Sequence, residues 1–271
     1  PMPRFKQIPQ ILQLMSQKDH IRNISITAHI DHGKTTLTDH LLAEAGLLAP
    51  SIAGQARALD YLQEEQRRGI TIKTANISLI HETQGTPYLI NLIDTPGHVD
   101  FTNKTTQALR ATDGTIIIID AVEEIMPQTE TVTKQALQEL VKPTLFINKI
   151  DRLITELKLS PKQIENKLTH IITDFNNLIE LYAEHDYAQK WKIDPKLGNV
   201  TFGSALHKWA FTLATAQEQN IRFTDIINTY RNHAYKKLPD FLSISKTTLD
   251  MAVKHLPSPK EAQRYRIPKI W

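Results

Sequence analysis

The stretch AHIDHGKT at positions 28–35 decides the fold that this sequence predicts. An apolar, β-branched run at 21–27 precedes it, and an apolar segment with helical periodicity follows it and ends at Gly46. A strand, a loop and a helix are therefore expected in succession. The loop matches the phosphate-binding pattern G-x-x-x-x-G-K-[ST] except at its first position, where Ala28 replaces glycine.

The chemistry of this loop suits a nucleotide phosphate. Phosphate binding requires backbone N–H groups at a helix N-terminus, a cation for the β and γ oxygens, and a hydroxyl for Mg²⁺. Gly33, Lys34 and Thr35 provide these groups. The alternative is a loop that contains Gly-Lys-Thr by chance, and the preceding strand and following helix favour phosphate binding over it.

Further strands extend the predicted sheet. They are expected at 75–82, 87–93, 115–120, 143–148 and 200–203. Gln84-Gly85-Thr86 indicates a hairpin between the first two, and a helical segment near 128–140 separates the next pair. This alternation is typical of a mostly parallel sheet flanked by helices, so the predicted fold class is α/β.

Two amphipathic helices are also predicted. Ser160-Pro161-Lys162-Gln163 has the form of a capping box and opens a long helix. Its apolar stripe is expected to face the core and consists of Ile164, Leu168, Ile171, Ile172, Phe175, Leu178, Ile179 and Tyr182. A short N-terminal amphipathic helix, with Pro9 near its start, is predicted from the spacing of Ile8, Ile11, Leu12 and Met15. It is expected to dock on the main domain.

A second motif, DTPGH at 94–98, follows a predicted strand. A carboxylate at a strand end suits the hydration shell of Mg²⁺, and the Gly97 N–H can approach a γ-phosphate because no side chain obstructs it. His98 would then lie beside the reacting phosphate, where a histidine can orient an attacking water and change charge near neutrality.

The third motif, NKID at 148–151, also follows an apolar run. The two oxygens of Asp151 can accept from the ring N–H and the exocyclic amine of guanine, a donor pair that adenine lacks. Lys149 can lay its aliphatic stem over the base. Alone, the tetrapeptide also fits a capped turn. Ser204-Ala205-Leu206 follows another predicted strand and favours a nucleotide site over that alternative. The Ala205 N–H is expected to contact the guanine carbonyl.

Thr71, within RGITI at 68–72, is the candidate for a nucleotide-sensing switch. Such a switch needs a mobile hydroxyl that reaches Mg²⁺ only when the γ-phosphate is present. The alternative is an ordinary threonine at a strand entry.

Composition and charge limit the classes of protein to which this chain can belong. The 271 residues contain no cysteine, which excludes disulfides and fits the cytoplasm, and no apolar stretch approaches the length of a membrane span. The net charge of +3 does not indicate a DNA-binding protein. Nine Lys or Arg and three acidic residues lie between Arg231 and Trp271, which suits a solvated linker or a contact with a phosphate backbone.

In this order the motifs resemble those of the translational GTPases, and most closely those of the archaeal elongation factor 2 family. The resemblance covers nearly the whole chain and rests on residues 28–35, DTPGHVDF at 94–101, MPQTET at 126–131 and HLPSP at 255–259. The last of these lies outside the nucleotide site. Alanine at the first loop position is usual in that family, so Ala28 supports the resemblance.

The resemblance implies roles by position. The nucleotide-binding residues it implies are Ala28, His29, Ile30, Asp31, His32, Gly33, Lys34, Thr35, Thr36, Asp94, Thr95, Pro96, Gly97, His98, Asn148, Lys149, Ile150, Asp151, Ser204, Ala205 and Leu206. Thr35, Thr71 and Asp94 would hold Mg²⁺, and the implied catalytic residues are His98, Gly97 and Thr71.

The implied protein is a translocase that moves tRNA and mRNA through the ribosome, with this chain as its GTP-hydrolysing domain. GTP or GDP and Mg²⁺ are the implied ligands, and the ribosome is the implied partner, through large-subunit RNA and stalk proteins. Hydrolysis is expected to be slow without the ribosome. The chain is expected to be a monomer that binds neither membrane nor DNA.

Two other readings stay open. One is a stand-alone GTP-gated module that docks on ribosomes, and the other is a translational GTPase that delivers tRNA, against which the Pro257-Ser258-Pro259 region argues. Thr102-Asn103-Lys104 departs from the small residues and acid usual in the family, so the second switch is expected to behave differently. The family would also continue beyond Trp271 into a β-barrel and three further domains.

The expected organisation has three parts. Residues 1–20 comprise a tag remnant, because Pro1 precedes Met2, and the N-terminal helix. Residues 21–256 form the GTP-binding domain, with the family's insertion roughly within 152–200. Residues 257–271 form a linker toward a second domain.

Overall fold

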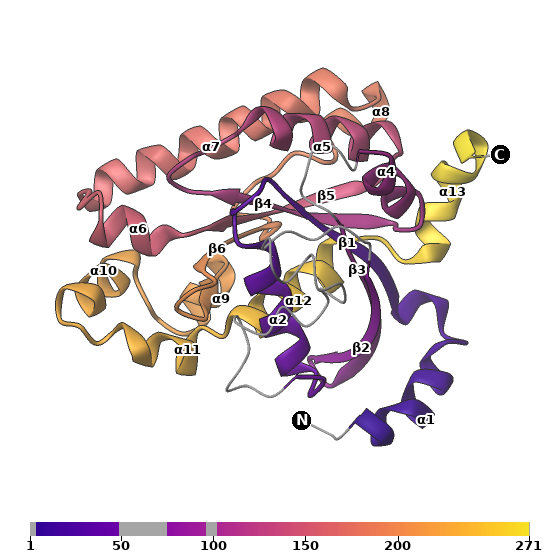
Figure 1. Cartoon of the computed structure of the whole chain (residues 1–271), viewed down its shortest axis with the longest axis horizontal. Helices are drawn as coiled ribbons and strands as arrows, with labels where there is room; N and C mark the ends of the chain where they lie inside the picture. The colour runs from indigo at the N-terminus through magenta and orange to yellow at the C-terminus, as the bar shows by residue number, and fades with distance from the viewer. Residues whose placement is uncertain (1–3, 49–74, 96–101, 271) are drawn as a thin grey trace.

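The computed structural model describes residues 4–48, 75–95 and 102–270, which form a sheet with helices on both faces (Figure 1). The sheet has seven strands in the order β2-β3-β1-β4-β5-β6-β7. The strands are β1 (Ile21–Ala28), β2 (Ala75–Thr83), β3 (Thr86–Asp94), β4 (Gly114–Asp120), β5 (Lys142–Asn148), β6 (Val200–Ser204) and β7 (Trp209–Phe211). Only the edge strands β2 and β7 pair antiparallel. The predicted α/β class is confirmed.

The central strand β4 shows why both faces of the sheet are covered. Ile117 and Ile119 belong to one core cluster, with side chains from α5 (Pro127–Gln138) and α7 (Pro161–Tyr182). Ile116 and Ile118 belong to the other cluster, with side chains from α2 (Lys34–Glu44) and α12 (Ile244–His255). A continuous apolar run, rather than an alternating one, is what a strand buried on both faces requires.

The long helix α7 forms as the sequence predicts. The Ser160 hydroxyl accepts from the Gln163 N–H and the Gln163 side chain accepts from the Ser160 N–H, which completes the capping box. Five members of the predicted stripe are buried, namely Ile164, Leu168, Ile171, Phe175 and Ile179. The other three are partly buried.

The remaining helices lie around this frame. They are α1 (Arg4–Leu14), η1 (Lys18–His20), α4 (Thr102–Arg110), α6 (Ile150–Thr155), α8 (His185–Ala188), α9 (Leu213–Glu218), α10 (Phe223–Arg231), η3 (Tyr235–Lys237), α11 (Leu238–Phe241) and α13 (Pro259–Ile270). Within the described ranges, none combines the length and the apolar character needed to cross a membrane.

Helix α1 presents a different face from the one expected. Ile8, Leu12 and Met15 are 51%, 63% and 58% exposed, whereas Leu14 is only 2% exposed. The helix contacts β2 and β3 of the sheet. The helix thus docks on the domain as expected, but three of the four residues of the apolar pattern are exposed and Ile11 is partly buried. Periodicity assigns an apolar face to a helix but does not say which neighbour covers it.

The C-terminal segment is a packed helix instead of the expected linker. Arg266 of α13 is 4% exposed and donates to the carbonyl oxygens of Leu109 at 3.1 Å and Glu139 at 3.2 Å, and also to that of Thr112. Leu109 lies in the last turn of α4, Thr112 follows that helix, and Glu139 caps α5. Arg266 thus anchors α13 to the domain. The domain boundary at 256/257 stays a prediction.

His255, at the end of α12, predicts acid sensitivity of the fold. Burial, together with Lys254 and Lys142, lowers the pKa of His255 to about 4, whereas an unfolded histidine has a pKa of about 6.5. As pH falls from 6.5 to 4, the unfolded chain takes up a proton that the folded chain does not, so the free energy of unfolding falls. The contribution of His255 to the free energy of unfolding is therefore fully present above pH 6.5 and is lost as the pH falls toward 4.

Urea denaturation of the chain and of His255→Gln, at pH 7.5 and pH 5, measures this effect. Between pH 7.5 and pH 5, the free energy of unfolding is expected to fall more for the unsubstituted chain than for His255→Gln. His185→Gln is the matched control, since the His185 side chain is fully exposed. A difference independent of pH would contradict the assignment.

Candidate functional site

The ends of the parallel strands place the predicted residues at one edge of the sheet. Ala28, Asp94, Asp120, Asn148 and Ser204 are the last residues of β1, β3, β4, β5 and β6. Because these strands run parallel, their carboxyl ends share one edge, which is the usual ligand position in an open α/β sheet. Four of these five residues were predicted from the sequence to belong to the site, and the structure adds Asp120.

The loop between β1 and α2 turns sharply toward this edge. Asp31 and Gly33 have φ values of 61° and 95°, in the left-handed region, and Gly33 caps the N-terminus of α2. A Cβ atom on Gly33 would lie 2.2 Å from Asn148 Nδ2. Only glycine fits there. The first turn of α2 therefore begins directly at the sheet edge, with its N–H groups outside the helical ladder.

A buried ion pair joins the first and second motifs. Lys34 Nζ lies 2.6 Å from Asp94 Oδ1, and the two side chains are 8% and 1% exposed. Each charge balances the desolvation cost of the other. The Thr95 hydroxyl donates to the Ile26 carbonyl at 2.8 Å and holds the chain where it leaves β3. The cation and the carboxylate expected at a phosphate site are thus side by side.

Asn148 connects three loops. Its Nδ2 donates to the His32 carbonyl at 2.8 Å, and its Oδ1 accepts from the Ala205 N–H at 2.9 Å. Asn148 is 2% exposed. The sequence assigned Asn148 and the Ala205 N–H to the base, but in this structure they bond to each other. The reason is that β5 and β6 are neighbours, and an amide offers a donor and an acceptor.

Asp120 is the site residue that sequence reasoning missed. It is fully buried, and its Oδ2 lies 2.8 Å from Lys149 Nζ and 3.4 Å from an Arg152 guanidinium nitrogen. Its Oδ1 accepts from the Val122 N–H at 2.8 Å. Asp120 therefore orients Lys149, whose stem was predicted to cover the base. A carboxylate ending the apolar run 115–120 was the signal available in the sequence.

His32 contacts β4 and Glu123 through its two ring nitrogens. Its Nδ1 lies 3.2 Å from the Asp120 backbone nitrogen and 3.4 Å from the Ile118 carbonyl oxygen. Nε2 lies 3.3 Å from Glu123 Oε2. Burial lowers the pKa of His32, although the nearby carboxylates oppose this. The lowered pKa favours a neutral His32, and its side chain connects the phosphate loop to β4.

Asp151 keeps acceptor capacity for a ligand. It lies in the first turn of α6 and is 4% exposed. Its Oδ1 accepts no hydrogen bond from the residues that the structure describes, and its Oδ2 is 4.0 Å from His207 Nδ1. Buried carboxylate oxygens are normally satisfied. This carboxylate fits a ligand that brings two donors.

The other predicted residues have varied positions. Thr71, Pro96, Gly97 and His98 lie outside the described residues. Ile150 is fully buried in the core, whereas Leu206 is 69% exposed. The half-buried residues of the phosphate loop and of the first turn of α2 are His29, Ile30, Gly33, Thr35 and Thr36.

The donor set fits a Mg²⁺ ion that arrives with a nucleotide. Among the described residues, no cluster of three or more His, Asp or Glu side chains could hold a metal ion. Thr35 and Asp94 would supply protein oxygens, while Mg²⁺ ordinarily completes its shell with phosphate oxygens and water.

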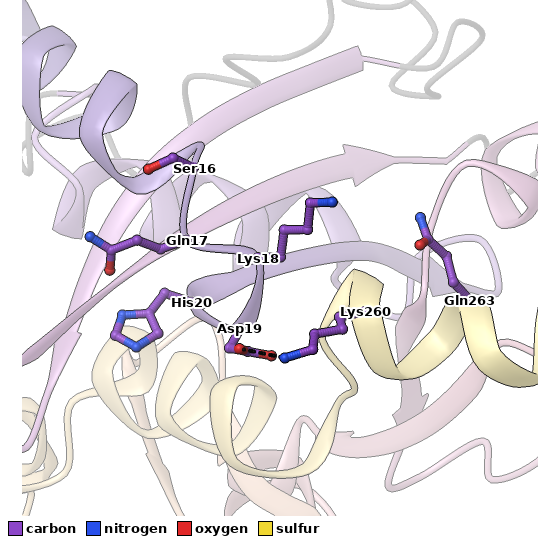
Figure 2. A pocket seen from close by; sticks show the side chains of 7 residues that line it. All are labelled: Ser16, Gln17, Lys18, Asp19, His20, Lys260 and Gln263. Carbon is purple, nitrogen blue, oxygen red and sulfur yellow. Dashed lines mark hydrogen bonds and ion pairs between the residues drawn. The ribbon is translucent and has the colours of Figure 1, made fainter.

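A separate polar pocket of about 570 Å³ lies between η1 and α13 (Figure 2). It is lined by Ser16, Gln17, Lys18, Asp19, His20, Lys260 and Gln263. Lys260 and Asp19 form an ion pair of 3.1 Å across it. None of the predicted nucleotide residues lines this pocket, so it is distinct from the site at the strand ends.

Comparison with known proteins agrees with this geometry. The family described as "Elongation factor Tu GTP binding domain" matches residues 19–258. The chain is 54% identical over 273 residues to elongation factor 2 of Sulfurisphaera tokodaii, and 54% identical over 272 residues to that of Staphylothermus marinus. It is 53% identical over 273 residues to elongation factor 2 of Sulfolobus acidocaldarius. Each match covers 100% of this chain and 37% of the relative's length.

Proposed function

The chain belongs to the family of the elongation factor Tu GTP binding domain, and from this premise we propose that it binds GTP and hydrolyses it to GDP and phosphate. The observation that carries the proposal is the convergence of Lys34, Asp94 and Asp151 at the carboxyl edge of one parallel sheet. Lys34 and the first turn of α2 would receive the phosphates. Asp151 would accept the two guanine N–H donors.

The proposal extends to the ribosome. We propose that this chain is the GTP-hydrolysing part of a factor that drives translocation of tRNA and mRNA. The 54% identity to elongation factor 2 supports this, and the chain spans 37% of such a relative's length. Large-subunit RNA and stalk proteins are the proposed contacts. We also propose that the domain is monomeric, works in the cytoplasm and is slow without the ribosome.

The catalytic roles remain proposals that rest on sequence. His98 would orient the attacking water, the Gly97 N–H would face the γ-phosphate, and Thr71 would respond to it. Mg²⁺, held by Thr35, Thr71 and Asp94, would neutralise phosphate charge. The proposed GTP-binding domain comprises 21–256, with a compact insertion within 152–200.

Asp151→Asn is expected to change base preference. The substitution replaces one of the two carboxylate oxygens that accept from guanine by an amide NH₂ group. This NH₂ group can donate to the second carbonyl of xanthine. Two charge-assisted hydrogen bonds are at stake, so the affinity for GTP should fall roughly a hundredfold while that for xanthosine triphosphate rises. Calorimetry with GTP, ATP and xanthosine triphosphate measures this. Asp186→Asn, at a side chain that is 85% exposed, is the matched control. Unchanged preference would refute guanine recognition by Asp151.

His98→Ala tests hydrolysis separately from binding. The variant is expected to bind GTP normally and to lose about a hundredfold in ribosome-stimulated turnover, the usual scale for an acid–base or water-orienting group. The measurement is phosphate release by the full-length factor on ribosomes, with His185→Ala as control because the His185 side chain is fully exposed. Equal turnover would remove His98 from the mechanism.

A further inference from the structure

A hydrogen-bonded aromatic cluster adjoins Asp151. His207, in the turn between β6 and β7, directs Nδ1 toward the Tyr230 hydroxyl at 2.7 Å. The Trp209 indole Nε1 lies 2.8 Å from the same hydroxyl. Tyr235 lies against the His207 ring at 4.5 Å and stacks on Tyr230 at 5.0 Å. The cluster joins α10 and η3 to the loop that follows β6.

The donors and acceptors around the Tyr230 hydroxyl limit where its proton can lie. The Trp209 indole only donates, so the Tyr230 oxygen accepts from it. Ser204 is a further hydrogen-bond partner of Tyr230, and the Ser204 oxygen already accepts from the His207 N–H at 3.1 Å. The Ser204 hydroxyl has a second lone pair and a proton, so it can accept from Tyr230 or donate to it. When Ser204 donates, the Tyr230 oxygen accepts two hydrogen bonds and its own proton goes to His207 Nδ1, which places the imidazole proton on Nε2.

This tautomer matters because His207 faces Asp151. Nδ1 is 4.0 Å from Asp151 Oδ2. An unprotonated Nδ1 offers the carboxylate no proton and no charge, whereas a protonated Nδ1 would pair with it. A paired carboxylate would lose an acceptor that guanine needs.

We propose that Tyr230 keeps Asp151 available for guanine by holding His207 in the tautomer whose Nδ1 carries no proton. The inference rests on the proposed guanine recognition by Asp151. Tyr230 is thus a positioning residue that acts through His207. It lies on α10, after the base-contacting loop in the chain, and no nucleotide motif contains it.

The surroundings of His207 support this role. The groups that face it are Asp151 from α6, Tyr230 from α10 and Tyr235 from η3. Burial lowers the pKa of His207, while Asp151 opposes the shift. Burial also raises the pKa of Tyr230, so its hydroxyl keeps its proton throughout the physiological range. Asp151 is the charged group that draws a proton toward His207 once Tyr230 no longer occupies Nδ1.

Tyr230→Phe is expected to make nucleotide affinity pH-dependent. Without the hydroxyl, His207 can protonate and pair with Asp151. Protonation of His207 increases as the pH falls, so the affinity of this variant for GDP should be lower at pH 6 than at pH 8. Calorimetry at both values measures this against Tyr230→Phe/His207→Leu, in which every other titratable group remains. This difference in affinity between pH 6 and pH 8 should vanish in the double variant.

The outcomes separate this inference from the proposed function. If Asp151→Asn leaves base preference unchanged, guanine recognition fails and the inference fails with it. If Asp151→Asn changes base preference but Tyr230→Phe matches the double variant at both pH values, guanine recognition stands and the role of Tyr230 is overturned. A purely structural Tyr230 would weaken binding equally at pH 6 and pH 8.

The tautomer itself is measurable without relying on a variant's fold. Long-range ¹H–¹⁵N NMR of the ¹⁵N-labelled chain reports which imidazole nitrogen of His207 is protonated, with His207→Asn used only to assign the signal. The expected result is a proton on Nε2 from pH 6 to pH 8. A proton on Nδ1 would overturn the proposal.

Discussion

Lys34→Met is expected to lose nucleotide binding and to destabilise the fold. The substitution leaves the Asp94 carboxylate, 1% exposed, without its ammonium partner. Breaking a buried ion pair from one side costs about 3–5 kcal/mol. Loss of the cation for the phosphates should weaken GDP binding by roughly a hundredfold or more. Urea denaturation and calorimetry measure the two effects.

Two further variants separate stability from binding. Lys162→Met breaks an exposed pair with Glu165, whose side chains are 73% and 65% exposed, and should change stability by at most about 0.5 kcal/mol. Lys34→Met/Asp94→Asn removes both buried charges and should recover much of the stability without recovering GDP affinity. If the double variant binds GDP normally, Lys34 acts only through the fold.

Gly33→Ala is expected to disable the phosphate loop. Alanine at a φ of 95° carries backbone strain of about 1–2 kcal/mol, and its Cβ atom would lie 2.2 Å from Asn148 Nδ2. Asn148 must then move and give up its bonds to the His32 carbonyl and the Ala205 N–H, each worth about 1 kcal/mol. Together these losses predict roughly a hundredfold weaker GDP binding, measured by calorimetry.

Gly85→Ala provides a matched control. Gly85, in the turn between β2 and β3, also has a positive φ, of 76°, but its added Cβ would meet no described atom within 4 Å. It should lose about 1 kcal/mol of stability through backbone strain alone and keep its GDP affinity. Equal loss of affinity in both variants would show that strain, and not the contact with Asn148, governs the loop.

Much of the site could be predicted because its motifs are local. The phosphate loop needs a strand, a glycine turn and a helix within one short segment, and all three are legible along the chain. Asp94 and Asn148 end apolar runs, and parallel strands bring such ends together. The sheet hairpin and the α7 stripe follow from periodicity in the same way.

The partners of these residues could not be predicted locally. Asn148 bonds to Ala205 because β6 lies beside β5, and Asp120 meets Lys149 because β4 lies beside β5 on its other side. These strands follow one another in the chain, but the register between them and the paths of the loops that follow them decide which side chains meet. The same holds for Tyr230, which reaches His207 only after α10 folds back toward the loop that follows β6.

The sequence by itself predicted six of the strands and the helices at the phosphate loop and at 161–182, and it proposed which residues carry phosphate and guanine chemistry, since both depend on neighbours along the chain. The tertiary structure alone decided that α1 buries Leu14 and exposes most of its predicted apolar pattern, that Arg266 anchors α13, and that Asn148 binds the phosphate loop to Ala205. These contacts join distant segments. Their geometry depends on strand order and on which buried polar groups remain to be satisfied, and only the folded chain settles both.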